Sequence, residues 1–196
     1  MHSLLLLLGL PGALFWRELP PERWSDRDLQ EFLQESPWAH PAENASSFAP
    51  NGVQTFIGSA SIVRAAEREL ERRTRPRPDP AKPVEPDEYS LYLKESKDKV
   101  IVLVVAMADW QKMSDAEEAN MMEKETLLKI GRRKYRLEGH FPPTPNDSYL
   151  RLVFPRDIRD SDKTMVFELY VPGAPGPYRT VEYNLREMKR DGKLDL

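Results

Sequence analysis

The sequence predicts an α+β protein, in which N-terminal helices are followed by a mainly antiparallel β-sheet and a proline-rich linker lies between the two. Helical patterns with caps occur before residue 74, and short strand patterns separated by turns occur after residue 99. Five prolines within residues 74–88 favour an extended, semi-rigid spacer. A chain of 196 residues can bury a core without disulfides, so we expect residues 17–73 and 89–196 to form one domain.

The first helix is predicted after Ser25, whose side chain can cap the free backbone N–H groups of a helix N-terminus. Acidic residues follow in the first turn, where the helix dipole favours negative charge. Trp24 and Leu29 occupy the two positions of a hydrophobic staple. Because a residue before proline disfavours the helical conformation, the helix should end near Glu35, ahead of Pro37.

A second helix is predicted over residues 62–73, with Ser59 or Ser61 as its cap. Arginine and glutamate cover most of its surface, and its apolar residues form one narrow stripe. Glu69 and Arg73 are spaced for a favourable ion pair one turn apart. The stripe consists of Ile62, Ala66 and Leu70.

The strongest strand signal is the continuous β-branched run at residues 100–107, which predicts a central strand buried on both faces with helix on one side. Residues 40–52 are expected to form a loop and 53–57 a short strand, while 114–122 fit either a short acidic helix or a loop. Alternating patterns predict the remaining strands, the first two joined as a hairpin around residues 131–134. They cover residues 126–130, 135–141, 149–154, 164–171, 178–185 and 193–196.

Residues 1–16 are interpreted as a leader or signal segment, because Leu4–Leu10 is apolar whereas the chain after it is polar and charged. The block is too short to span a bilayer, so no transmembrane helix is expected. The charged region of a signal peptide is reduced here to Met1 and His2, as if the true start lay further upstream. The prediction is a periplasmic or secreted protein, and the alternative is a buried apolar segment ending at Trp16.

Three short elements occur together: Ser-Pro-Trp-Ala at residues 36–39, Leu-Val-Phe-Pro-Arg at 152–156, and an ending formed by 183–188 and 192–196. With the leader, they resemble a family of uncharacterised exported bacterial proteins that end on a Phe-x-Leu-Lys-x-Met…Gly-Lys-Leu-Glu-Leu type segment. Here tyrosine, arginine and aspartate replace the phenylalanine, the lysine and the glutamate. The resemblance implies export and a single architecture. It implies no activity and supplies no catalytic residues.

Most reactive chemistries have no support in the sequence. The absence of cysteine excludes disulfides, thiolate nucleophiles and zinc sites with cysteine ligands. His2, His40 and His140 are too scattered for a helical metal motif. No glycine-rich phosphate-binding motif occurs, and residues 58–61 are not a nucleophile elbow. The sequence therefore predicts no metal, no cofactor and no specific catalytic residue, although its 32 acidic residues leave a catalytic carboxylate pair open.

The candidate interaction patch is the dense basic stretch formed by Arg132, Arg133, Lys134 and Arg136 around Tyr135. Such a cluster can contact phosphate groups or an acidic partner. The alternative is a charged hairpin tip that keeps a sheet edge from pairing with other chains, with Tyr135 facing the core. The net charge of −3 argues against nucleic acid as the partner, because it provides no overall attraction.

Three functions remain open at this point. The leading expectation is an exported, non-enzymatic binding or interaction domain of the bacterial cell envelope, since no reactive cluster is recognisable. The second is a hydrolase that uses dispersed carboxylates, which would need two carboxyl groups about 5–9 Å apart in a cleft with aromatic residues. The third is a cytoplasmic adaptor that binds nucleic acid or an acidic partner through the basic hairpin. Perturbed titratable groups gathered in a deep pocket would count against the first.

Overall fold

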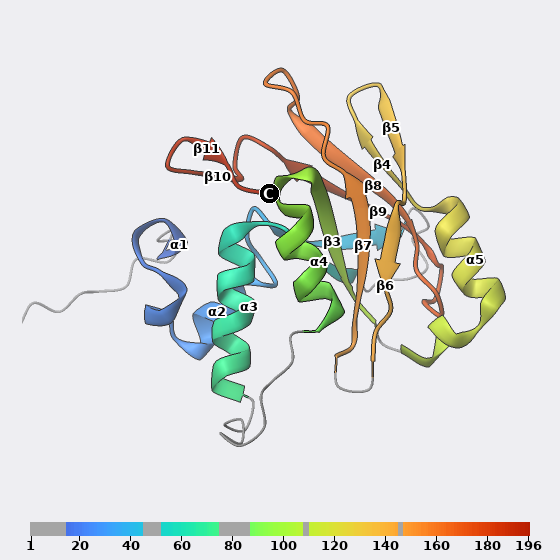
Figure 1. Ribbon diagram of the computed structural model, residues 1–196, viewed down its shortest axis with the longest axis horizontal. Coiled ribbons are helices and arrows are strands. Elements are labelled where there is room, and N and C mark those ends of the chain that lie inside the picture. Colours follow the sequence, from blue (N-terminus) through green and yellow to red (C-terminus); the bar gives the residue numbers. More distant parts are fainter. Residues whose placement is uncertain (1–14, 45–51, 75–86, 108–109, 145–146) are drawn as a thin grey trace, which may run out of the picture.

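The computed structural model describes residues 15–44, 52–74, 87–107, 110–144 and 147–196, and it confirms the predicted α+β class. Within this part of the chain, nine strands form one antiparallel sheet that curls into a half-barrel (Figure 1). The strands are β1 (Ala39–Asn44), β2 (Val53–Ile57), β3 (Val100–Ala106), β4 (Leu127–Ile130), β5 (Arg133–Arg136), β6 (Gly139–Phe141), β7 (Tyr149–Pro155), β8 (Thr164–Tyr170) and β9 (Tyr178–Asn184). Their order across the sheet is β5-β4-β8-β9-β1-β2-β3-β7-β6.

Short helices precede and interrupt this sheet, and a small hairpin follows it. The helices are α1 (Phe15–Glu18), α2 (Asp26–Phe32), α3 (Ser61–Thr74), α4 (Glu88–Ser96) and α5 (Ala116–Glu125), with single 3-10 turns η1 (Pro21–Arg23), η2 (Lys97–Lys99) and η3 (Trp110–Ser114). The hairpin consists of β10 (Lys189–Arg190) and β11 (Lys193–Leu194), which pair only with each other. Figure 1 shows α3 and α4 beside each other on one face of the sheet and α5 at its far end.

Because the sheet is curved, aromatic rings from strands that are not neighbours pack together in the core. Phe154 on β7 and Phe167 on β8 come from strands that are not neighbours, yet their ring centroids lie 5.3 Å apart. Tyr183 on β9 joins them at 5.9 Å from Phe167, and its hydroxyl lies 2.8 Å from the hydroxyl of Thr55 on β2. Both hydroxyls are buried, so this hydrogen bond satisfies polar groups that would otherwise be costly.

The β3 strand was predicted correctly from its composition. Residues 100–105 are all buried, and β3 pairs with β2 on one side and β7 on the other. Tyr89 on α4 covers it by donating a hydrogen bond to the carbonyl of Gly58, 3.4 Å away. A Cβ atom at Gly58 would lie 2.6 Å from Val104, so only glycine allows this close approach of helix, turn and strand.

Of the two predicted helix caps, the one on α2 is correct and the one on α3 is wrong. Ser25 and Asp28 form a reciprocal capping box on α2, as expected, although α2 ends at Phe32 rather than near Glu35. The cap predicted for α3 is wrong. The Asp195 carboxylate, at the other end of the chain, accepts hydrogen bonds from the backbone N–H groups of Ser61 (2.6 Å) and Ile62 (3.1 Å) and from the Ser61 hydroxyl.

The Ser59 hydroxyl, the other cap candidate, instead accepts a hydrogen bond from the backbone N–H of Val102. Residues 114–122, predicted as helix or loop, contain most of α5, whose cap is Asp115. The ion pair predicted between Glu69 and Arg73 is present at 2.7 Å. The carboxylate of Glu69 also pairs with Arg72, and this double pairing keeps its pKa low, at about 2.

Three strand and helix predictions need correction. Residues 40–52, expected as loop, begin with most of β1, which buries Ala39 and Ala42 and pairs with β2 and β9. Helix α4 was not predicted. The single strand predicted over 135–141 is two strands, because β5 pairs with β4 whereas β6 leaves that hairpin and pairs with β7.

The N-terminal predictions are only partly covered by the structure. Residues 1–14 of the leader and 75–86 of the linker lie outside the described residues. Phe15 and Trp16 pack onto the aromatic residues of the first helical region, with ring centroids 5.1 Å from Trp24 and 5.9 Å from Phe32, respectively. In the described part of the chain, no helix is long and apolar enough to cross a membrane.

Candidate functional site

A cavity of about 860 Å³ lies between α3, α4 and the strands β3 and β7. Its wall is part apolar and part charged. Phe56, Leu93 and Val100 belong to the core, while the charged side chains come mainly from α3 and from α4 with its flanking residues, and β7 contributes Arg151. Helix α3 contributes four of them because charged residues occupy the part of its surface beside the apolar stripe. The charged lining residues include Arg64, Glu67, Arg68, Glu71, Asp87, Lys94, Asp147 and Arg151.

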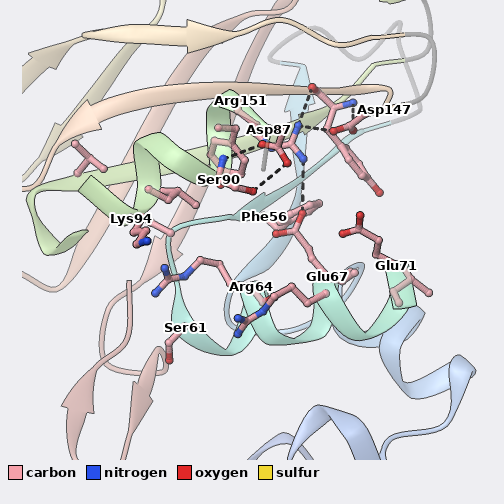
Figure 2. A pocket seen from close by; sticks show the side chains of 18 of the residues that line it. Phe56, Ser61, Arg64, Glu67, Glu71, Asp87, Ser90, Lys94, Asp147 and Arg151 are labelled. Carbon is pink, nitrogen blue, oxygen red and sulfur yellow. Dashed lines mark hydrogen bonds and ion pairs between the residues drawn. The ribbon is translucent and has the colours of Figure 1, made fainter. Parts of the chain in front are cut away.

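At the centre of the cavity, one guanidinium group faces two carboxylates. Arg151 on β7 approaches Asp147 at 2.8 Å and Glu67 on α3 at 4.0 Å. Figure 2 shows Glu67 pointing from α3 toward Arg151, with Asp147 on the other side of the guanidinium group. The side chains are 12% exposed for Arg151 and 21% exposed for Glu67, so water screens the three charges only weakly.

Aromatic rings hold Arg151 in position. Its guanidinium carbon lies 4.5 Å from the ring centroid of Tyr89 and 5.9 Å from that of Tyr149. A cation over an aromatic face is attracted by the ring quadrupole, more strongly where water is excluded. Burial raises the pKa of both tyrosines, so their hydroxyls remain neutral. Arg151 is thus a rigid cation that is neutralised by carboxylates from two elements.

Glu67 is the most perturbed acid of the cavity. Loss of water around its carboxylate raises the pKa from 4.5 to about 7, an effect that Arg151 opposes only in part. Asp147 adds to the rise by repelling a second negative charge. At neutral pH, Glu67 therefore exchanges between its protonated and its ionised form, whereas a solvated glutamate would be fully ionised.

Three further cations that line the cavity have no carboxylate of a described residue within ion-pair distance. Arg64, Arg68 and Lys94 make no ion pair with any described residue. Arg64 and Lys94 lie at the same end as Ser61 in Figure 2, away from Asp147. The Nε atom of Arg64 is buried and has no acceptor in the described structure. A buried N–H group without an acceptor costs about 1–3 kcal/mol, and the Nε atom of Arg151 beside the two acids also has none in the described structure.

The interaction patch predicted from sequence lies elsewhere, at the β4–β5 hairpin. Arg133 is not a free cation, because it pairs with Asp162 and with Asp157, the latter at 2.8 Å. Arg132, Lys134 and Arg136 are exposed. Tyr135 is half-buried and its hydroxyl donates to Asp157, so Arg133 and Tyr135 fasten the hairpin to the loop after β7.

The histidines give no metal site in the part of the chain that is described. No group of three or more His, Asp or Glu side chains there is arranged to hold an ion. His40 packs 5.1 Å from the ring of Tyr183, and burial lowers its pKa. His140 approaches Glu123 at 3.5 Å.

Sequence reasoning missed every charged residue of the cavity. The only available signal was the polar face of α3, where Arg64, Glu67 and Glu71 recur at helical spacing. That pattern is typical of an ordinary solvated helix face. Only the approach of Arg151 from a distant strand distinguishes it as a buried charge cluster.

Comparison of the chain with models of protein families, with curated proteins and with solved structures gave no match.

Proposed function

We propose that the protein is a binding domain for a small organic anion, which would occupy the cavity between α3, α4 and the sheet. The observation that carries this proposal is that acids lining the cavity have partners, whereas three of its cations form no ion pair with a described residue. The acids Glu67 and Asp147 already face Arg151, and Asp87 accepts hydrogen bonds from the backbone and the side chain of Ser90. Of the other lining acids, Asp98 approaches Arg156 and Glu71 also has a partner. The cations Arg64, Arg68 and Lys94 form no ion pair with a described residue, so we expect the group that completes the site to be an anion.

The size and the wall of the cavity suit a small organic molecule. Ligand sites usually enclose about 300–1,000 Å³, with apolar surface for most contacts and a few polar groups for orientation. Arg64, Arg68 and Lys94 could bind a carboxylate, while the ligand body would lie on Leu93 and Tyr149. Hydrogen bonds to charged groups contribute about 1.5–3 kcal/mol each where water is excluded.

Titration calorimetry with benzoate as the first probe tests this site. Wild-type protein should bind benzoate, and the double variant Arg64→Gln/Lys94→Gln should bind it about tenfold or more weakly, since each lost charged hydrogen bond removes 1 kcal/mol or more. Arg27→Gln is the matched control, because Arg27 is an exposed cation on α2 that does not line the cavity. Equal binding by the double variant and wild type would refute the proposal.

We also propose that the domain acts outside the cytoplasm, in the periplasm or as a secreted protein. The support is the apolar block Leu4–Leu10 and the resemblance to exported bacterial proteins. Cell fractionation with an intact mass for each fraction tests this. A shortened N-terminus in an extracytoplasmic fraction is the expected result, and a full-length cytosolic protein would contradict it.

A carboxylate-based hydrolase is the second candidate, and Glu67 specifically favours it, because a titratable group with a shifted pKa inside a cavity counts against a purely non-enzymatic binding domain. A pair of acids in different environments is the usual arrangement for general acid and base roles. With a pKa of about 7, Glu67 could donate or accept a proton at neutral pH, and Asp147 beside Arg151 could serve as its ionised partner. Glu67→Gln separates the two functions, because it would abolish turnover but leave benzoate binding at the cationic end intact.

A further inference from the structure

A second hollow, of about 480 Å³, lies at the end of the sheet where β7 and β9 finish. Its walls are the loop 156–163 between β7 and β8, the turn after β9, and the β10–β11 hairpin. In Figure 1 these segments lie along the upper edge of the molecule. Ile158, Leu185 and Leu194 give the hollow an apolar part.

Basic side chains dominate this hollow. Two acids, Asp160 and Asp162, line it together with six cations, although the whole chain has a net charge of −3. Asp162 is already engaged by Arg133 and by the backbone N–H of Arg159. The six cations are Arg156, Arg159, Lys163, Arg186, Lys189 and Lys193.

Most of these cations are exposed and have no counter-ion. Arg156 pairs with Asp98 at 3.7 Å, and Arg159 approaches Asp157 at 3.9 Å. No described residue forms an ion pair with the other four, which come from the loop, the turn and the hairpin. Three separate segments thus direct unpaired positive charge into one concave surface.

The hairpin retains this charge at a cost to its own stability. Arg190 and Lys193 are direct partners across the β10–β11 ladder, and like charges in this position repel. The turn between them, at Asp191 and Gly192, has positive φ values of 49° and 76°, which hold the two strands in this tight register. Arg190 relieves part of the repulsion by approaching Asp195 at 4.0 Å, whereas Lys193 lines the hollow.

We propose that this hollow binds a polyanion that carries several phosphate or sulfate groups. A single anionic group would neutralise only a fraction of the cations, while adjacent groups on one molecule would contact the loop, the turn and the hairpin together. The site shares no lining residue with the cavity between α3 and α4, so this proposal does not rest on the function proposed there.

Titration calorimetry with tripolyphosphate tests the site. Wild-type protein should bind tripolyphosphate, with an affinity that falls as salt concentration rises. The double variant Lys189→Glu/Lys193→Glu should weaken binding by about tenfold or more, because it reverses two charges that line the hollow. The control Lys112→Glu/Lys124→Glu makes the same change of net charge at exposed residues of η3 and α5, which do not line the hollow, and should bind like wild type.

The outcomes separate the site from general charge attraction. No binding of tripolyphosphate at low salt overturns the proposal, as does equal weakening by both double variants. Circular dichroism melting checks that the variants fold, and Lys189→Gln/Lys193→Gln replaces the charge reversal if that variant does not. Phosphatidylglycerol vesicles identify the source of the anion. Co-sedimentation that tripolyphosphate reverses indicates a lipid headgroup, and binding of tripolyphosphate without co-sedimentation indicates a soluble polyanion.

Discussion

Replacing Glu67 with glutamine should stabilise the folded protein by about 3 kcal/mol at about pH 8 and change its stability little near pH 4. The pKa of Glu67 rises from 4.5 to about 7 on folding, chiefly because burial removes water from the carboxylate. A raised pKa means that the folded state binds the proton more tightly than the unfolded state does. The stability that Glu67 contributes is therefore fully present below pH 4.5 and is lost as pH rises through about 7.

Urea unfolding of wild type and variant across this pH range measures the effect. The variant should become more stable relative to wild type as the pH rises from about 5 to about 8. The total change in unfolding free energy should be about 1.4 kcal/mol for each unit by which folding shifts the pKa of Glu67. Glu95→Gln is the control, because Glu95 is an exposed glutamate on α4 and its replacement should give a difference that does not follow the same curve. If Glu67→Gln were no more stable than wild type at the alkaline end, the buried-carboxylate description of the cavity would be wrong.

Replacing Trp38 with alanine should destabilise the protein by about 3–5 kcal/mol, the usual cost of removing a large buried aromatic side chain. Trp38 is 1% exposed and packs 5.8 Å from the ring of Phe32. Its indole N–H donates a hydrogen bond to the backbone carbonyl of Asp195 at 2.8 Å. Since the Asp195 carboxylate caps α3, the substitution also loosens the segment that holds this cap in place.

Trp38→Phe separates packing from hydrogen bonding. It keeps an aromatic ring but leaves the Asp195 carbonyl without its donor, so we expect a loss of about 1–3 kcal/mol. Thermal and urea unfolding of both variants provide the measurement. A loss below about 1 kcal/mol for Trp38→Ala would contradict the anchoring role, because it would place the side chain outside the cooperative core.

Much of the fold could be predicted from local patterns. The capping box at Ser25 depends on two side chains three residues apart, so the sequence displays it completely. The continuous apolar run of β3 is likewise a local signal, in this case of a strand buried on both faces. The alternation of β8 and β9 is the local signal of a strand buried on one face. These elements were found because the information for each lies within a few neighbouring residues.

The elements that were missed depend on distant partners. β1 contains Pro41 and few large apolar residues, and it is a strand because β2 and β9 offer it backbone partners. The chain of β5 and β6 divides because two different strands, β4 and β7, each pair with one part of it. Strand pairing of this kind is set by the whole sheet rather than by propensity.

The candidate site divides in the same way. The sequence by itself determined the class of fold, the buried strand beneath the cavity, the charged face of α3 and the absence of cysteine chemistry, because each follows from composition or spacing. Only the tertiary structure decided that Glu67 meets Arg151, that Asp195 caps α3, and that cations from three segments surround one hollow. The physical reason is that desolvation and charge pairing depend on the atoms around a side chain, and most of those atoms belong to residues far away in the sequence.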